Sequence, residues 1–303
     1  MYKKMLVTLD GSELAEIVLD YARELAIGLG LDAILLHIYS QSECEFISMR
    51  RGYLNRVADV LERDIYNIRE KFGNKLKSES PAVRSEIVEG HAAEEIVRYA
   101  DIHQIDLILM ATHGRSGIRR WAVGSVADKV VRATRRPVLL VRAKASYEFL
   151  NRIIIPLDGS KESEAVVGFV EELASGLNSE IILLQVLEQF YHVQTSGGRS
   201  VRVRYSDKRI EQLKDGAMNY LERITSQLKD KGINTGFEVK IGLPPVEIIK
   251  FASDKQARLV AMLRRRRFGI SPLDIGSVAD KVLRRGLTPV LLFSAPGRAH
   301  RKE

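Results

Sequence analysis

Several features that carry chemistry in other proteins are scarce or missing in this sequence. The chain has a single cysteine, Cys44, so it cannot form an internal disulfide, and a reducing, cytoplasmic setting is expected. No apolar run approaches the roughly 20 residues of a membrane-spanning helix, and the apolar stretch near the N-terminus is too short for a signal peptide. There is no Gly-Lys-Ser/Thr phosphate loop, and the six histidines lack metal-ligand spacing. No membrane span and no metal held by protein side chains are therefore expected.

Charge of one sign does not dominate either. Lysine and arginine number 47 against 39 acidic residues, which gives a net charge of +8 on a mixed surface. The excess is local, and lies in the arginine clusters at 264–267, 135–136 and 284–285 and in the tail at 298–302. Such clusters can attract phosphates, but most charge runs are solvated faces. Charge alone therefore selects no function.

What the sequence does contain is a repeat of itself. The segment Gly124–Val130 recurs unchanged as Gly276–Val282, and Pro137–Leu140 recurs as Pro289–Leu292 at the same offset of 152 residues. Upstream, Leu-Asp-Gly-Ser at 9–12 recurs at 157–160, an offset of 148. The second copy has therefore gained a few residues, which we place near 195–198. The period is far too long for a solenoid, so we expect two tandem domains, at 1–143 and 151–296, with 142–151 as the linker.

Each copy alternates predicted strands and helices. Strands are expected at 4–9, 33–38, 83–88, 106–110 and 137–141, and again near 152–157, 181–187, 236–241, 259–263 and 289–293. In the first copy Ser12 should cap a helix that Gly28 and Gly30 end, and 56–76 should form a long amphipathic helix. Strands that alternate with helices predict a parallel sheet covered on both faces, with the ligand crevice at the carboxyl ends of the strands.

The loop after the fourth strand is a candidate phosphate cradle at that edge. It runs from Ala111 through Gly114 and Gly117 to Gly124-Ser125, where a helix begins. Glycines allow close backbone approach, the helix start offers free N–H groups and positive dipole charge, and Arg115 or Arg119 could add charged contacts. The alternative is a surface turn with a serine cap.

Asp10 is the second candidate, because it follows the first strand at the same edge. Its carboxylate could accept hydrogen bonds from adenine or a ribose hydroxyl. The alternative is an ordinary Asp-Gly-Ser turn into a capped helix, which would also explain the counterpart Asp158.

Taken together, Asp10, the run Leu107–Gly114, the pair Gly124-Ser125 and the strand Pro137–Val141 resemble the universal stress protein family over essentially the whole chain, as a tandem two-domain member. The resemblance implies two Rossmann-like α/β domains, each a five-stranded parallel sheet in the order 3-2-1-4-5, with ATP or AMP held between strands one and four and Mg²⁺ accompanying ATP. It implies the nucleotide-binding residues Thr8, Leu9, Asp10, Ile38, Met110, Ala111, Gly114, Gly124, Ser125 and Val126, to which the loop itself adds Arg115 and Gly117.

The second copy departs from the family motif. At the offset of 152 its two early motif positions are Leu263 and Arg266, although Asp158, Gly276, Ser277 and Val278 remain as candidates. A bulky side chain stands where the cradle needs bare backbone. We therefore expect a lost or altered site in the second copy.

The leading functional hypothesis is a cytoplasmic adenine-nucleotide-binding regulator or sensor of a stress response, acting on a protein partner that the sequence does not identify. One rival is slow ATP hydrolysis at the same site, although no nucleophile–base pair is visible. The other is a nucleotide-independent protein that binds an acidic partner or nucleic acid through arginine patches; no pattern of stacking aromatics supports nucleic acid. The last strands of the two copies should pair as an internal pseudo-dimer, as they pair between subunits in the family, and a further homodimer remains open.

Overall fold

The computed structural model describes residues 2–72, 80–112, 123–142, 150–194, 200–264 and 275–294. The first copy contains β1 (Lys4–Thr8), α1 (Glu13–Glu16), α2 (Val18–Leu29), β2 (Asp32–Tyr39), the 3-10 helix η1 (Gln41–Phe46), α3 (Ile47–Phe72), β3 (Val83–Glu89), α4 (Ala92–Ile102), β4 (Leu107–Ala111), α5 (Ser125–Ala133) and β5 (Val138–Val141). The second contains β6 (Arg152–Pro156), α6 (Lys161–Leu177), β7 (Glu180–Leu187), β8 (Phe190–Gln194), β9 (Ser200–Arg204), α7 (Asp207–Asp230), β10 (Thr235–Ile241), α8 (Pro244–Asp254), β11 (Leu259–Arg264), α9 (Ser277–Arg285) and β12 (Val290–Ser294).

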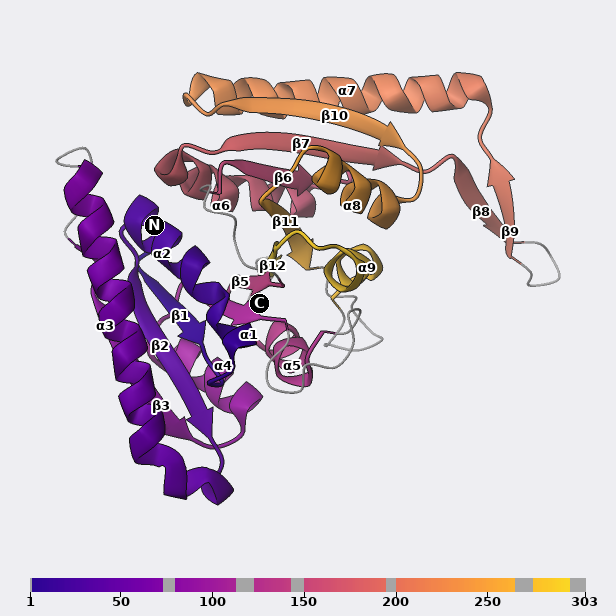
Figure 1. Cartoon of the computed structure of the whole chain (residues 1–303). Helices are drawn as coiled ribbons and strands as arrows, with labels where there is room; N and C mark the ends of the chain where they lie inside the picture. The colour runs from indigo at the N-terminus through magenta and orange to yellow at the C-terminus, as the bar shows by residue number, and fades with distance from the viewer. Residues whose placement is uncertain are drawn as a thin grey trace, which may run out of the picture.

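The main sheet has ten strands in the order β10-β7-β6-β11-β12-β5-β4-β1-β2-β3. Each copy contributes a parallel half-sheet in the predicted order 3-2-1-4-5, so that expectation is confirmed. The halves join where β12 pairs antiparallel with β5, with Leu291 opposite Leu139, and Figure 1 shows this seam near the middle of the molecule. Pairing the two apolar last strands leaves neither as an open sheet edge.

Two apolar layers run across both copies. Residues from α2, α3, α6 and α7, such as Leu25, Leu54, Leu173 and Leu221, pack on one face of the sheet. The helices α4, α5, α8 and α9 cover the other face, with Val130 and Phe251 among the buried residues. The amphipathic periodicity of these helices and the continuous apolar strands are what a sheet buried on both faces requires. Of the helices in the described segments, none combines the length and apolar character of a bilayer span.

The prediction that Gly28 and Gly30 end the helix after Ser12 is confirmed for Gly30 and wrong for Gly28. Gly28 lies inside α2, and the helix ends at Gly30, whose φ of 68° is left-handed. A methyl group added at Gly28 would stand 2.2 Å from Cδ2 of Leu177, and one at Gly176 would stand 2.2 Å from Cδ2 of Leu29. The two glycines are equivalent positions of the duplication, and they let α2 and α6 cross closely. The expected single helix after Ser12 is also divided, at Ile17, into α1 and α2, and the expected helix at 56–76 begins earlier, at Ile47.

Two glutamates at equivalent positions, Glu24 and Glu172, each accept a hydrogen bond from the backbone of the other copy. The backbone N–H of Leu150 donates to Glu24 at 3.0 Å, and the N–H of Tyr2 donates to Glu172 at 2.9 Å. Leu150 and Tyr2 are equivalent positions, each just before the first strand of its copy. Burial raises the pKa of Glu24 to about 7, although the hydrogen bond from Leu150 opposes the shift.

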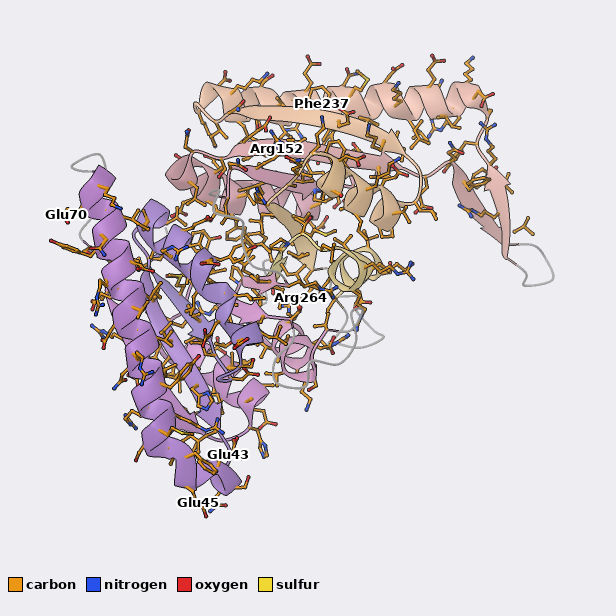
Figure 2. The ribbon with its side chains drawn as sticks, in the orientation of Figure 1. Glu43, Glu45, Glu70, Arg152, Phe237 and Arg264 are labelled. Carbon is orange, nitrogen blue, oxygen red and sulfur yellow. The ribbon has the colours of Figure 1, made fainter. Side chains whose placement is uncertain are left out.

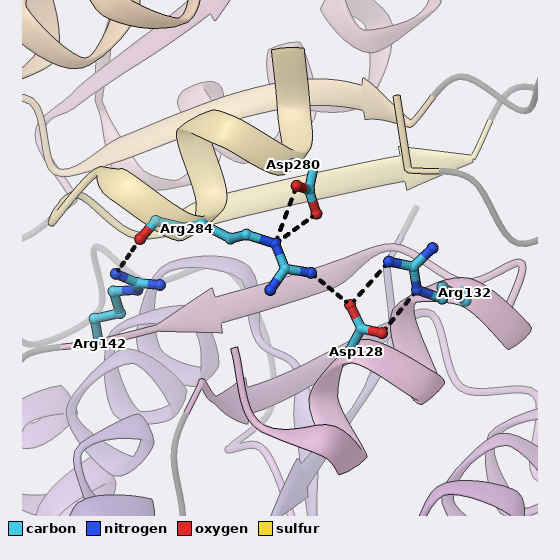
Figure 3. A network of polar contacts seen from close by, with 5 residues as sticks. All are labelled: Asp128, Arg132, Arg142, Asp280 and Arg284. Atoms are coloured by element: carbon cyan, nitrogen blue, oxygen red, sulfur yellow. Dashed lines mark hydrogen bonds and ion pairs between the residues drawn. The ribbon is translucent and has the colours of Figure 1, made fainter. Parts of the chain in front are cut away.

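A third set of contacts holds the last helices of the copies together, as Figure 3 shows. Arg284 on α9 pairs with Asp280 on its own helix at 2.9 Å and with Asp128 on α5 at 3.2 Å. Asp128 also pairs with Arg132 at 2.7 Å. Arg142, just after β5, donates to the carbonyl of Arg284 at 3.0 Å. Arg284 and Arg132 thus both form ion pairs at the interface between the two copies, which we call the joint.

Candidate functional site

The predicted ligand edge lies where β1 ends between two neighbours. β1 pairs with β2 on one side and with β4 on the other, so the direction in which strands are added reverses at this point. In parallel sheets such a reversal opens a crevice beyond the carboxyl ends of the strands. The hydroxyl of Thr8 donates to the carbonyl of Leu109 at 3.3 Å, and the N–H of Leu9 donates to the carbonyl of Leu36 at 3.0 Å. The carboxyl end of β1 is therefore hydrogen-bonded to both neighbouring strands, β4 and β2.

Asp10 forms the predicted turn. One carboxylate oxygen, Oδ1, accepts from the N–H of Ser12 at 2.9 Å and from its hydroxyl at 2.6 Å. Ser12 in turn accepts from the N–H of Ala15 at the start of α1. Asp158 accepts from the N–H of Ser160 at 3.1 Å in the same way. The turn that the alternative interpretation predicts is therefore present in both copies, and it leaves the expected contact of Asp10 with a ligand as a prediction.

The start of α5 is fixed against the end of β4. The N–H of Gly124 donates to the carbonyl of Thr112 at 2.6 Å, and the N–H of Thr112 donates to the carbonyl of Val141 at 2.8 Å. Gly124 is the N-cap residue with φ −59° and ψ 150°, and the exposed Ser125 follows as the first helical residue. The free N–H groups of the first turn and the positive end of the helix dipole therefore lie at the carboxyl edge of β4, a suitable place for an anion.

The remaining predicted site residues fall on both faces of the sheet. Ile38, Met110 and Val126 belong to the apolar layer under α4 and α5, whereas Leu9 and Ala111 belong to the layer on the other face. Gly114, Arg115 and Gly117 lie outside the described residues. Tyr39, the last residue of β2, directs its hydroxyl to Glu89 at 3.4 Å.

The buried histidine His37 lies in β2 next to the carboxyl end of β1 and was not identified from the sequence. His37 contacts the carbonyl of Leu9 through Nδ1 at 2.7 Å and Nη1 of Arg50 through Nε2 at 2.7 Å, and Arg50 pairs with Glu43 at 2.6 Å. A guanidinium only donates, so Nε2 must accept and Nδ1 carries the proton that is donated to Leu9. A lone histidine in an apolar strand was the only available signal, because both partners come later in the chain.

Tyr53 adds a second polar contact near Asp10. Its hydroxyl donates to Glu16 at 2.6 Å. Burial raises the pKa of Tyr53 well above its usual value, and the hydrogen bond to Glu16 and the charges of Glu16 and Asp10 add to the shift. The phenol therefore stays protonated and remains a donor.

The equivalent edge of the second copy is built differently. Gly276 has φ 91°, in the left-handed region, where its counterpart Gly124 has φ −59°. The histidine is replaced by Gln185 and Thr112 by Arg264. Asp158 and Ser277 are exposed and Val278 is half-buried. The backbone conformation of the N-cap glycine and two side chains at this edge thus differ between the copies.

The side chain of Arg264 corrects the view of 264–267 as one arginine patch. Arg264 is only 2% exposed; it donates to the carbonyl of Thr134 in the first copy at 2.5 Å and to the hydroxyl of Ser294. Figure 2 shows it at the junction of the copies, far from Glu43 and Glu45 at the outer end of the first. It is a joint residue and is not available to an external anion; residues 265–267 lie outside the described segments.

Comparisons with known proteins agree with the duplication. A model of the universal stress protein family matches residues 1–142 and again 150–294. Universal stress protein MJ0577 of Methanocaldococcus jannaschii is 31% identical over 159 residues, which cover 48% of this chain and 98% of that protein. Universal stress protein Slr1230 of Synechocystis is 34% identical over 139 residues, 46% of this chain and 42% of that protein.

Solved structures extend the likeness to the whole chain. A universal stress protein from Archaeoglobus fulgidus aligns over 97% of this chain and 98% of its own, with a TM-score of 0.64 and 17% identity. A protein of unknown function from Pseudomonas aeruginosa aligns over 97% of this chain and 93% of its own, with a TM-score of 0.71 and 14% identity. At these identities the likeness supports the two-copy fold alone.

Proposed function

The chain belongs to the universal stress protein family, and on this basis we propose that its first copy binds an adenine nucleotide, ATP or AMP, and acts as a nucleotide-dependent regulator or sensor in a stress response. The observation that carries the proposal is the anchoring of α5. The hydrogen bond from Gly124 to Thr112 holds the free N–H groups of a helix start beside the β1–β4 crevice. An anion placed there gains backbone donors and the helix dipole at once.

The proposal assigns the base and ribose to the strand ends and the phosphates to the helix start. Thr8, Leu9, Asp10, Ile38, Met110 and Ala111 would contact the nucleoside. Gly124, Ser125 and Val126, with Gly114, Arg115 and Gly117 from the connecting loop, would hold the phosphates, and Mg²⁺ would accompany ATP. In Asp10 one carboxylate oxygen accepts two hydrogen bonds from Ser12, which restrict the orientation of the carboxylate.

We propose one site per chain. In the second copy the N-cap glycine has a left-handed backbone, and Arg264 occupies the position of Thr112 and reaches into the joint. Asp158 forms the same turn as Asp10, but Gly276, Ser277 and Val278 would lack the helix start that supports binding in the first copy.

A calorimetric titration tests both statements. ATP and AMP, each with Mg²⁺, are titrated into the nucleotide-stripped full chain and into Gly124→Arg. The φ of −59° and ψ of 150° at Gly124 suit any residue, so the variant should fold while its side chain fills the phosphate position. We expect saturable binding near one per chain that the variant abolishes. Binding near two per chain would overturn the single site, and no binding of either nucleotide would overturn the function.

A further inference from the structure

Three polar side chains of the first copy form a chain of contacts that ends at the carboxyl edge of β1. Glu43 of η1 pairs with Arg50 of α3 at 2.6 Å, and Arg50 donates from Nη1 to His37 at 2.7 Å. Nδ1 of His37 donates to the carbonyl of Leu9 at 2.7 Å, and only 3% of His37 is exposed. Because Leu9 directly precedes Asp10, this chain ends beside a residue of the proposed nucleotide site.

Both polar backbone groups of Leu9 are hydrogen-bonded to β2. The N–H of Leu9 donates to the carbonyl of Leu36 at 3.0 Å, and the carbonyl of Leu9 accepts from His37. The backbone that leads into the Asp10 turn is therefore held by that strand. A binding residue keeps its geometry when the groups that support it are themselves locked by hydrogen bonds.

The start of α3 supports the Asp10 turn from a second direction as well. Tyr53 lies three residues after Arg50, on the same side of the helix, and its hydroxyl donates to Glu16 at the end of α1 at 2.6 Å. The helix α1 begins directly after the turn, with Ser12 as its N-cap. Arg50 is thus linked to the residue before the turn and Tyr53 to the helix after it.

The second copy is built differently at this position. His37 is replaced by Gln185, and the segment that holds η1 in the first copy holds β8 and β9 in the second. Oε1 of Gln185 is buried, and it has no hydrogen-bond partner among the residues that the structure describes. Asp158 nevertheless forms the same turn as Asp10. Formation of the turn therefore does not account for the chain of contacts in the first copy.

We propose that His37 is a positioning residue of the nucleotide site, which relays the Glu43–Arg50 pair to the carbonyl of Leu9 and holds Leu9 and Asp10 in the binding geometry. The inference rests on the proposed function, and it assigns part of the affinity to three residues outside the proposed contacts. Arg50 only donates, so Nε2 of His37 has to accept and Nδ1 has to carry the proton. The carboxylate of Glu43 holds the guanidinium that selects this tautomer.

Two amide variants at position 37 separate the two contacts of the imidazole. Nδ2 of asparagine is bonded to Cγ, as is Nδ1 of histidine, so His37→Asn keeps a donor for Leu9 but loses the contact with Arg50. The glutamine amide lies one bond further out, so His37→Gln, which introduces the second-copy residue, keeps an acceptor for Arg50 but loses the donor for Leu9.

Calorimetric titration of the full chain, with ATP or AMP, whichever binds wild type more tightly, compares these variants. We expect His37→Gln to lose about tenfold in affinity, the worth of one hydrogen bond, and His37→Asn less than about threefold. Urea unfolding of each variant shows that the affinities are compared among folded chains.

A double-mutant cycle tests the relay itself. Glu43→Gln should weaken binding about threefold in wild type, because the guanidinium of Arg50 loses its paired carboxylate, and should have no further effect in the His37→Gln background. The control Asp20→Asn breaks the ion pair with Arg23 in the same copy, at a carboxylate 34% exposed against 29% for Glu43. It should leave the affinity unchanged.

The ¹⁵N spectrum of the imidazole tests the tautomer without a nucleotide. The chain has six histidines, and the signals that disappear in His37→Asn identify those of His37. We expect Nδ1 protonated and Nε2 unprotonated.

Four results would overturn the inference while the proposed function stands. They are equal affinity of wild type and His37→Gln, an undiminished effect of Glu43→Gln in the His37→Gln background, an equal loss in the control Asp20→Asn, and a proton on Nε2. A wild type that binds neither nucleotide is a different result: the proposed function then fails, and this inference fails with it.

Discussion

The two copies use nonequivalent residues for the same task at their joint. The C-terminal end of α5 in the first copy receives Arg264 of the second, through the carbonyl of Thr134. The equivalent end of α9 receives Arg142 of the first copy, through the carbonyls of Arg284 and Gly286. At the counterpart positions stand Thr112 and Ser294. A cation at a helix C-terminus satisfies free carbonyls and the negative end of the dipole, and each copy supplies one from a different strand end.

Elsewhere at the joint the copies have stayed alike. The glycine pair Gly28 and Gly176 and the glutamate pair Glu24 and Glu172 occupy equivalent positions and make equivalent contacts. The interface between the copies thus keeps equivalent residues in both. The carboxyl edge of the sheet, in contrast, differs between them in the backbone of the N-cap glycine.

The largest effect should come from a charge at the two helix starts. Ser125→Glu should lower nucleotide affinity about 100-fold, because a carboxylate would repel the phosphates at the start of α5. Ser277→Glu, the matched change at the start of α9, should alter affinity less than about two-fold. Glutamate suits a helix N-terminus, so neither fold should suffer. Calorimetry on both variants checks this, and equal losses would show that the second copy also binds.

The next largest effect concerns the crossed arginines. Arg264→Thr, which installs the first-copy residue, should lower the free energy of unfolding by about 2 kcal/mol, because the fully buried carbonyl of Thr134 loses a charged donor. Arg142→Ser, the reciprocal exchange, should cost about 1 kcal/mol because Arg142 is only half-buried. Urea unfolding gives both values. A larger loss from Arg142→Ser would reverse the assigned importance of the two contacts.

The third prediction concerns pH. The folded state raises the pKa of Glu24 from its unfolded value of 4.5 to about 7, so the protonated form stabilises the fold fully below pH 4.5. This contribution is lost as the pH rises to about 7. At pH 8 Glu24→Gln should therefore exceed wild type in unfolding free energy by about 1 to 2 kcal/mol, and match it near pH 4. Urea titrations at both pH values check the sign; a wild type that gains stability over this window relative to the variant would contradict it.

The smallest effect concerns the helix crossing. Gly176→Ala should lower the unfolding free energy by about 1 kcal/mol, because the new methyl would also lie 3.1 Å from the carbonyl oxygen of Gly28. Gly28→Ala should cost less, since its methyl would lie 3.4 Å from the nearest carbonyl oxygen, that of Gly176. Gly216→Ala in α7, where nothing lies within 4 Å, should instead stabilise by up to about 1 kcal/mol through helix propensity. Thermal unfolding of the three variants ranks them.

Much of the fold was predictable because its signals are local or repeated. The duplicated Gly-Ser-Val-Ala-Asp-Lys-Val segment revealed two copies, continuous apolar runs marked buried strands, and the family resemblance supplied their order. The role of Arg264 was not predictable, since four consecutive arginines resemble a solvated charge run and the surface that buries the first belongs to the other copy. Gly28 was misinterpreted for a similar reason. A glycine near the end of a helix can either end the helix or allow another helix to cross closely, and only the position of the other helix distinguishes these roles.

The candidate site was partly predictable. Asp10, Thr112 and Gly124 lie at the expected edge, but the chain His37–Arg50–Glu43 joins elements that the sequence does not pair. The sequence predicted only an insertion near 195–198 where β8 and β9 form a hairpin. Polar and apolar residues that alternate on both sides of a Gly-Gly pair are nevertheless typical of a hairpin.

The seam between β5 and β12 has a consequence for how this protein can change over time. In a dimer of separate chains the pairing obeys mass action and weakens on dilution, whereas a covalent connection keeps the partners at an effective concentration in the millimolar range. The seam therefore forms at any cellular abundance. In a symmetric dimer every substitution at the joint appears twice. Here each side has its own codons, so an arginine such as Arg264 can enter one side without facing a copy of itself.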